Sequence, residues 1–180
     1  MKKLIILFFA VFIANLCHAQ DSMNFKIIDG EVVWQKVYES KDSINQIIKR
    51  LKIDGILKDI ELVENVLTAI IKDLDADYKG AGFSRGMAPM FLISDKITGS
   101  VTIDFKDGKY RATIKHMKME NKIATPISKI GETEPIETYA LKKKNTIFKS
   151  GFLTDPAIIL DYTFNKIFEK KEMKKEDENW

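Results

Sequence analysis

The stretch GSVTIDFKDGKYRATIKHMKM, residues 99–119, decides the fold, because it has the pattern of one long antiparallel hairpin. Asp107-Gly108 at its centre is a strong signal for a two-residue type I′ turn. With that turn, one face of both strands is apolar and the other places Asp104 beside Arg111, an opposite-charge pair. Turn chemistry, alternation and charge therefore agree on one register. That register pairs Lys106 with Lys109, Phe105 with Tyr110, Ile103 with Ala112 and Val101 with Ile114, and it puts His116 opposite Gly99 on the Tyr110, Ala112 and Ile114 face.

Toward the N-terminus, residues 25–38 predict a second hairpin around Asp29-Gly30. Its register pairs Ile28 with Glu31, Ile27 with Val32 and Phe25 with Trp34. The next segment has the period of a helix that ends at Asp54-Gly55. Its apolar face consists of Ile44, Ile47, Ile48 and Leu51, and its cap is one of Ser40, Asp42 and Ser43.

Residues 60–75 fit both a helix and strands. Apolar residues at helical spacing run from Ile60 to Leu74, yet β-branched residues dominate the segment. Glu64-Asn65 also has the composition of a turn. We therefore predict strands rather than a helix for this segment.

The order of these elements predicts the fold class. A strand pair, a helix, further strands, the long hairpin, a loop over 120–136 and a last helix give an α+β domain. We expect a curved antiparallel sheet with two helices packed on one face, formed by residues 20–168, followed by a charged, solvated tail over 169–180. The last helix begins at Thr154-Asp155-Pro156 and buries Ala157, Leu160, Phe164, Ile167 and Phe168.

The first nineteen residues have the pattern of a secretory signal peptide. Lys2 and Lys3 precede an apolar run over 4–16, and cleavage is expected after Ala19. The run is shorter than the about 20 residues that span a bilayer, so the mature chain is expected to be periplasmic or extracellular without a transmembrane segment. Cys17 follows Leu16 rather than a small residue, which argues against a lipid anchor at Cys17.

Composition limits the classes of function. Loss of Lys2 and Lys3 with the signal peptide lowers the formal net charge from +3 to +1, so we expect no nucleic-acid binding. The mature chain has no cysteine, which excludes disulfides and thiol chemistry. With one histidine in that chain, we predict neither a zinc site nor a cofactor.

Residues 82–86, GFSRG, match the G-x-S-x-G pattern that carries the nucleophile of many esterases. In those enzymes the serine lies between a buried strand and a helix. Here the polar stretch 77–81 precedes Ser84 and Pro89 follows closely, so neither element is expected. We interpret the match as an accident of a glycine-rich loop.

Asp73, Asp75 and Asp77 resemble the start of a calcium-binding loop. Such a loop also needs a glycine at its sixth position and a glutamate at its twelfth. Tyr78 and Ser84 occupy those two positions, so we predict no metal site of this type, although an improvised calcium site stays open as an alternative. The loop around them is polar and rich in glycine, where binding residues often lie. The candidate ligand or partner surface consists of Asp73, Asp75, Asp77, Ser84, Arg85 and His116.

Three short motifs carry a family resemblance: VWQKVY at 33–38, DFKDGKYR at 104–111 and DYTF at 161–164. On these motifs, residues 25–168 resemble exported proteins of Bacteroidetes-type bacteria with a DUF4468-like domain, a domain of unknown function with a TATA-binding-protein-like fold. The resemblance implies a curved antiparallel sheet with helices on one side. It implies no catalytic residues, and the name of the fold does not imply DNA binding.

The sequence thus supports two hypotheses of different classes. The first is a non-enzymatic exported domain that binds an unidentified protein of the bacterial cell envelope. The second is a small-ligand-binding protein or an enzyme that uses the loop over 73–90 together with His116.

Overall fold

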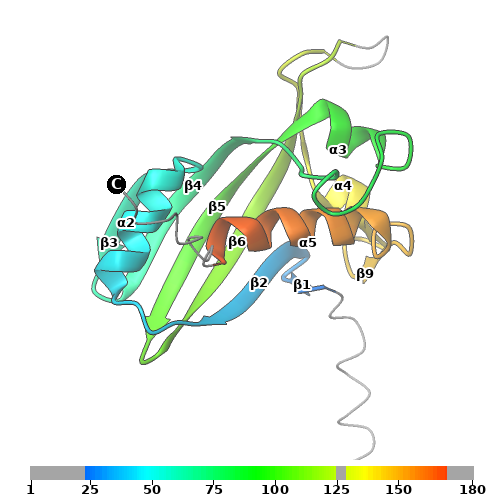
Figure 1. The fold of residues 1–180 in the computed structure, drawn as a ribbon. Coiled ribbons are helices and arrows are strands. Elements are labelled where there is room, and N and C mark those ends of the chain that lie inside the picture. Colours follow the sequence, from blue (N-terminus) through cyan, green and yellow to red (C-terminus); the bar gives the residue numbers. More distant parts are fainter. Residues whose placement is uncertain (1–22, 125–128, 170–180) are drawn as a thin grey trace, which may run out of the picture.

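The computed structural model of the chain describes residues 23–124 and 129–169 (Figure 1). The predicted signal peptide over 1–19 and residues 170–180 of the predicted tail lie outside the described residues. A curved antiparallel sheet of seven strands dominates the described part, in the order β1-β2-β6-β5-β4-β3 with β7 beside β6. Its strands are β1 (Phe25–Ile28), β2 (Glu31–Glu39), β3 (Leu57–Val63), β4 (Val66–Leu74), β5 (Asp95–Lys106), β6 (Lys109–Asn121) and β7 (Thr133–Pro135), and β8 (Leu141–Lys142) pairs separately with β9 (Ile147–Phe148).

The two longest described helices, α2 (Ile44–Asp54) and α5 (Asp155–Phe168), lie on one face of the sheet, as predicted (Figure 1). Two short helices, α3 (Met90–Ser94) and α4 (Glu137–Ala140), were not predicted, because one turn is too short for a periodic signal. Of the three predicted N-cap candidates, Ser43 is the one that caps α2, in a capping box with Gln46. Gly55 ends the helix in the left-handed conformation, with φ of 67°.

The strand registers confirm the predicted hairpins. Phe25 faces Trp34 across the first turn, and Asp104 faces Arg111 across the second. Residues 57–74 form β3 and β4, with Glu64 and Asn65 between them, so the choice of strands over a helix is also confirmed. The alternating apolar residues of these strands supply the inner face of the sheet.

The prediction for His116 was wrong because β6 contains a bulge. The pairing moves from Ser100 with Lys115 to Thr98 with Lys118, so β6 holds one residue more than β5 over this interval. His116 takes a positive φ of 52°, and its side chain is 59% exposed. Before the bulge, the even-numbered residues of β6 from 110 to 114 are buried. Beyond it, the buried residues are the odd-numbered Met117 and Met119. Glycine inside a strand often marks such a site, and Gly99 lies opposite the bulge.

The predicted loop over 120–136 is shorter than expected. Strand β6 continues to Asn121, and β7 pairs Thr133 with Glu120 and Pro135 with Lys118. A polar segment with prolines gives little strand signal, because β7 is held by main-chain bonds at a sheet edge rather than by apolar side chains. Residues 125–128 of this loop lie outside the described residues.

An aromatic cluster joins α5 to the sheet. Trp34 stacks on Phe168 with a centroid distance of 5.7 Å and meets Phe164 edge-on at 5.6 Å. Phe25 lies 6.3 Å from Phe164, so β1, β2 and α5 share one core. Burial of such rings is a large apolar contribution to folding. This packing leaves the loop after β4 to run across the outer side of α5.

Candidate functional site

Asp77 fastens the loop after β4 to the outer side of α5. Its backbone N–H donates to Thr163 Oγ1 at 2.9 Å, and Lys166 Nζ donates to its Oδ2 at 2.6 Å. The backbone N–H of Gly80 donates to Oδ1 at 2.9 Å. The Lys166 ammonium and this N–H together hold the pKa of the Asp77 carboxyl below its usual range, so the group is ionised near neutrality.

A groove of about 360 Å³ opens beside this attachment, between the end of β4, α5 and Ile56, which precedes β3. Its size falls within the range of small-molecule sites. The polar groups at the groove come from both the loop and the helix, so they carry charges of both signs. Its apolar lining consists of Ile56, Leu74, Ala76, Tyr78 and Ile167, and its polar lining consists of Asp75, Asp77, Lys79, Thr163 and Lys166.

Gly80 fits closely against the same attachment. A Cβ atom at this position would lie 2.5 Å from Asp77 Oδ2 and 2.6 Å from Tyr162 Cε1. Both distances are shorter than real Cβ contacts, so a side chain at position 80 would force the side chains of Asp77 and Tyr162 to shift. The sequence did not single out this glycine, because its constraint comes from α5, which is distant along the chain.

The other aspartates of the loop form separate ion pairs. Lys122 Nζ lies 3.3 Å from Asp73 Oδ1, and Lys96 pairs with Asp75. Exposed pairs of this kind contribute at most about 1 kcal/mol each. The described residues include no group of three or more acidic, histidine or cysteine side chains arranged to hold a metal ion.

Ser84 and Arg85 lie on the exposed turns of this loop. The Ser84 carbonyl accepts hydrogen bonds from the N–H groups of Met87 and Ala88, at 3.1 Å each. No strand enters directly before Ser84, since β4 ends at Leu74, and α3 begins at Met90. This geometry agrees with the interpretation of the G-x-S-x-G match as a loop, because a nucleophile elbow needs the strand.

His116 lies on a different surface from Asp77. Its Nε2 is 3.5 Å from a carboxylate oxygen of Glu31, at the start of β2. The bulge turns His116 away from the helices, whereas Asp77 binds α5 on the helix-covered side. The structure therefore brings Asp75 and Asp77 to one groove and places His116 outside it, beside Glu31. As a ligand or partner surface, the six selected residues stay a prediction.

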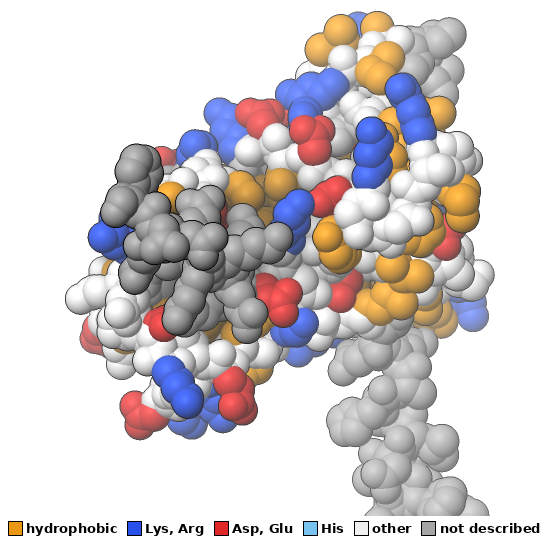
Figure 2. Space-filling model, in the orientation of Figure 1, with side chains coloured by type: hydrophobic (Ala, Val, Ile, Leu, Met, Phe, Trp, Pro, Cys, Tyr) orange, Lys and Arg blue, Asp and Glu red, His pale blue; other side chains and the backbone are white. Residues whose placement is uncertain are grey.

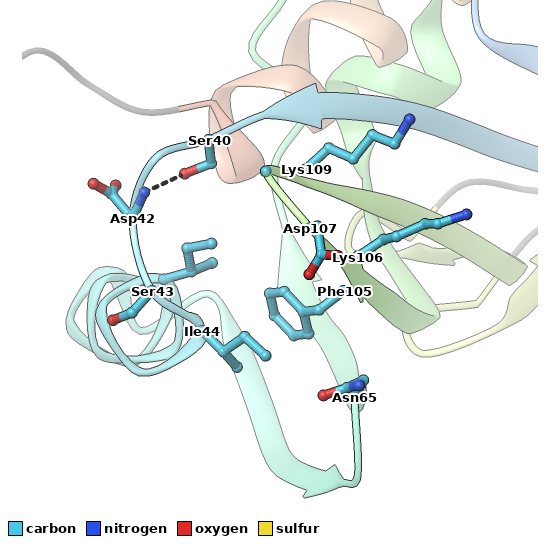
Figure 3. A pocket seen from close by; sticks show the side chains of 11 residues that line it. Ser40, Asp42, Ser43, Ile44, Asn65, Phe105, Lys106, Asp107 and Lys109 are labelled. Atoms are coloured by element: carbon cyan, nitrogen blue, oxygen red, sulfur yellow. Dashed lines mark hydrogen bonds between the residues drawn. The ribbon is translucent and has the colours of Figure 1, made fainter.

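A second pocket, of about 220 Å³, lies where the start of α2 meets the turn at Asn65 between β3 and β4 and the turn at Asp107-Gly108 between β5 and β6 (Figure 3). Its polar groups serve the fold. The Ser40 hydroxyl accepts from the Asp42 N–H at 3.1 Å, and Ser43 with Gln46 caps the helix. Asp42 and Asp107 stand against Lys106 and Lys109, so the lining has no excess of either charge. Because the helix start already has its cap, this pocket is a weak candidate for an anion site.

The face of the sheet away from α2 and α5 carries a row of polar side chains that sequence reasoning did not select. Gln35 Nε2 donates to Thr113 Oγ1 at 2.9 Å, and Lys26 Nζ donates to Gln35 Oε1 at 2.6 Å. The strand registers align the row as Glu61, Thr68, Thr102, Thr113 and Gln35, and the neighbouring row as Val63, Val66, Asp104, Arg111 and Val37. These ten residues and Ile70 form the open face, in which Thr113 is buried and the others are half-buried or exposed.

The open face combines exposed apolar residues with paired charges. Val37 is 54% exposed and Val63 is 69% exposed, at opposite ends of one row. Between them, Arg111 donates to Asp104 Oδ2 at 3.0 Å. Alternation in the sequence predicted polar residues on one face, but it did not show which residues of the five strands align in one row.

Surface charge on the helix side is mixed. Among the described side chains seen there, lysine, arginine and acidic residues are interspersed without a broad region of one sign (Figure 2). Nucleic-acid-binding domains present a basic stripe or patch, so this side lacks their electrostatic signature. Within 23–124 and 129–169, no helix is long and apolar enough to cross a membrane.

Comparisons with known proteins found similar crystal structures. No protein-family model matches the chain. No curated protein matches it at a significant level. It is similar to the crystal structure of a DUF4468 family protein from Bacteroides ovatus, with 13% identity, a TM-score of 0.48, and coverage of 84% of this chain and 94% of that chain. It is also similar to a TBP-like protein from Parabacteroides distasonis, with 13% identity, a TM-score of 0.45, and coverage of 79% of this chain and 88% of that chain. These are the family and the fold type that the sequence resembles.

Proposed function

We propose that this protein is an exported, non-enzymatic interaction domain of the bacterial cell envelope and that the open face is its contact surface. One observation carries the proposal: a sheet face of five strands presents exposed valines and Ile70 around ordered polar rows. Protein interfaces of the non-obligate kind mix apolar and polar side chains in this way. The signal-peptide pattern of residues 1–19 supports export.

Site-specific photo-crosslinking in the source cells tests this surface. A photoreactive residue is placed at Val66 or Thr102 on the open face, and at Ile53 as the matched control. Ile53 is 75% exposed on α2, on the covered side of the sheet, so it samples the same surroundings from the other side. We expect one envelope protein to crosslink from both open-face positions and not from Ile53. Equal capture from Ile53, or none from the open face, would sink the proposal.

Export is tested separately from the surface. The protein is recovered from the periplasm or the medium, and its intact mass is measured. A mass that matches a chain beginning at Gln20 supports cleavage after Ala19. Recovery of the full chain from the cytoplasm removes the export part of the proposal and leaves the contact surface to the crosslinking result.

The Asp77 groove supports a second candidate, a small-ligand-binding protein. The specific observation is an apolar lining next to charged groups that are held in place by α5. A fragment library is screened by NMR. Fragments that bind the groove should change the amide chemical shifts of Ala76 and Tyr78 together. Ile56→Trp, at a half-buried position of the lining, fills the groove and should abolish those shifts, whereas Ser84→Ala, on the exposed turn, should retain them. Shifts that survive Ile56→Trp would place the binding elsewhere.

A further inference from the structure

Four lysines gather at one end of the sheet face that lies opposite α2 and α5. The strand register puts them in two neighbouring rows, each with a lysine at both ends. One row consists of Lys58, Ile70, Ser100 and Lys115, and the next consists of Lys72, Thr98 and Lys118. We call these seven residues the lysine patch, and it adjoins the open face at Ile70.

The ammonium groups of these four lysines serve no contact of the fold. None of them has a hydrogen bond or an ion pair within residues 23–124 and 129–169. Other lysines at the same end of the sheet differ, because Lys96 pairs with Asp75, and Lys122 pairs with Asp73 and Glu120. These three carboxylates are therefore already bound, and the lysine patch keeps four positive charges that they do not neutralise.

Three β-bulges position the lysine patch. The pairing becomes irregular after Lys58 in β3, after Ile71 in β4 and after Lys115 in β6. At each bulge, the residue that directly follows a lysine of the patch has a positive φ, and these residues are Asp59, Asp73 and His116, with φ of 52°, 56° and 52°. Residues other than glycine rarely adopt this conformation, because it costs free energy. Bulges of this kind re-aim side chains next to functional sites, so three of them at one group of lysines indicate a built surface.

The spacing of the patch fits an extended acidic segment of a protein. Neighbouring strands lie about 4.8 Å apart, so the lysines at the ends of the two rows are about 14 Å and about 10 Å apart. An extended chain advances about 3.3 Å per residue, so about four residues cover the longer row. Between the lysines, Ile70 is 40% exposed and is flanked by the hydroxyls of Thr98 and Ser100. A less polar centre inside a charged rim is the usual anatomy of a protein interface.

An anionic membrane fits this face less well. Binding to a bilayer needs apolar side chains that enter the acyl boundary as well as basic groups. Here Ile70 lies in a row that ends in longer lysine side chains, so it does not project beyond them. The open face also carries Glu61 in the adjoining row, and anionic headgroups would repel its carboxylate. A protein partner can instead place each carboxylate opposite a lysine.

We infer that the lysine patch binds an acidic segment of the partner protein, whose carboxylates pair with the four lysines. The inference rests on the proposed interaction function and adds the charge of the partner and the end of the sheet that it contacts. Because ion pairs at an exposed surface are screened by salt, the affinity of this contact falls as ionic strength rises.

Titration of the mature chain with a synthetic polyglutamate peptide, followed by amide chemical shifts, tests the patch directly. The amides of Thr98 and Ser100 should shift. The patch variant combines Lys58→Gln, Lys72→Gln, Lys115→Gln and Lys118→Gln, and it should bind the peptide about tenfold more weakly, the combined effect of four exposed ion pairs. The matched control removes the same charge from exposed lysines elsewhere, with Lys41→Gln, Lys49→Gln, Lys143→Gln and Lys144→Gln, and it should bind like the parent chain.

Three outcomes of the titration overturn the inference. Absence of shifts at Thr98 and Ser100 in the parent chain shows that the patch does not bind carboxylates. Equal weakening in the patch variant and the control shows that net charge alone attracts the peptide. Binding of the parent chain to phosphatidylglycerol vesicles that the patch variant loses assigns the patch to a membrane instead. If the patch variant does not fold, the pair Lys72→Gln and Lys118→Gln replaces it, with Lys49→Gln and Lys143→Gln as its control.

Crosslinking in the source cells separates this inference from the proposed function. With the photoreactive residue at Thr102, the patch variant should lose most of the partner that the parent chain captures, and the control variant should retain it. Undiminished capture by the patch variant leaves the open face as the contact surface and overturns the role of the lysines. If the parent chain captures no partner, the proposed function fails, and the peptide titration by itself decides whether the patch binds carboxylates.

Discussion

Trp34 and Asp161 are joined by a hydrogen bond of 2.7 Å, from the indole N–H to Oδ1, that ties the middle of β2 to the middle of α5. The same carboxylate accepts from Asn24 Nδ2 at 2.8 Å and from Asn165 Nδ2 at 2.9 Å. Asn165 Oδ1 in turn accepts from the hydroxyl of Tyr38 at 2.8 Å. One helix carboxylate thus satisfies donors from the N-terminal segment, the sheet and its own helix, and it fixes how α5 lies on β2.

This relationship predicts a graded loss of stability at Asp161. Asp161→Ala leaves the buried Trp34 N–H without an acceptor and should lower the free energy of unfolding by about 2–3 kcal/mol. Asp161→Asn keeps one oxygen for Trp34 but loses the charge, so its effect should be smaller. Urea unfolding followed by circular dichroism measures both. Equal effects of the two variants would contradict a role for the retained acceptor.

The ion pair between Asp77 and Lys166 predicts a pH dependence of stability. Lys166 and the Gly80 N–H lower the pKa of Asp77 in the folded state from its ordinary value of 3.8. A group whose folded pKa is depressed stabilises the fold above its unfolded pKa, and that contribution is lost as pH falls through the folded pKa. The parent chain should therefore lose its stability advantage over Asp77→Asn between about pH 5 and pH 2.

Urea midpoints of the parent and Asp77→Asn, measured across that interval, check the expectation. Asp107→Asn is the control: it removes one carboxylate from a hairpin turn and keeps the hydrogen-bonding shape of the side chain. A difference between the parent and Asp77→Asn that stays constant with pH would show that Asp77 contributes through shape rather than through its charge.

The cap of α2 gives a prediction about local structure. Ser43 Oγ accepts from the Gln46 N–H, and the Gln46 side chain accepts from the Ser43 N–H at 2.8 Å. Ser43→Ala removes the first bond and should cost about 1 kcal/mol in the free energy of unfolding. Ser100→Ala, at an exposed strand position, is the matched control and should change it little. An effect at Ser43 no larger than that at Ser100 would mean that the cap does not stabilise the helix.

Local signals account for what could be predicted of the fold. The Asp29-Gly30 and Asp107-Gly108 turns each fix a register by themselves, and alternation then assigns the inner face. The bulge at His116 escaped this reasoning, because a single extra residue reverses the alternation without changing the composition of the strand. The helices α3 and α4 escaped it because one helical turn has no period to detect.

The candidate site was harder to predict, since its contacts join distant parts of the chain. Asp77 was selected from its loop, but its partner Lys166 lies 89 residues away and carries no local signal. The rows of the open face depend on strand order, which places β6 between β2 and β5. Neither relationship follows from turn chemistry or periodicity, so both required the three-dimensional arrangement.

The close approach at Gly80 predicts a contrast between two glycines of the same loop. Gly80→Ala forces a methyl group against Asp77 and Tyr162, so the attachment of the loop to α5 must shift. Overpacking of this kind costs about 1–3 kcal/mol. At Gly86, a Cβ atom would meet no described atom within 4 Å, and the backbone has no positive φ. Gly86→Ala should therefore be neutral or slightly stabilising, because alanine lowers the conformational entropy of the unfolded chain. Urea unfolding of both variants measures the contrast, and hydrogen exchange at Tyr78 reports whether the loop has moved. If the two alanine variants are equally stable, the loop tolerates a side chain at Gly80, and Asp77 does not hold it as closely against α5 as the structure indicates.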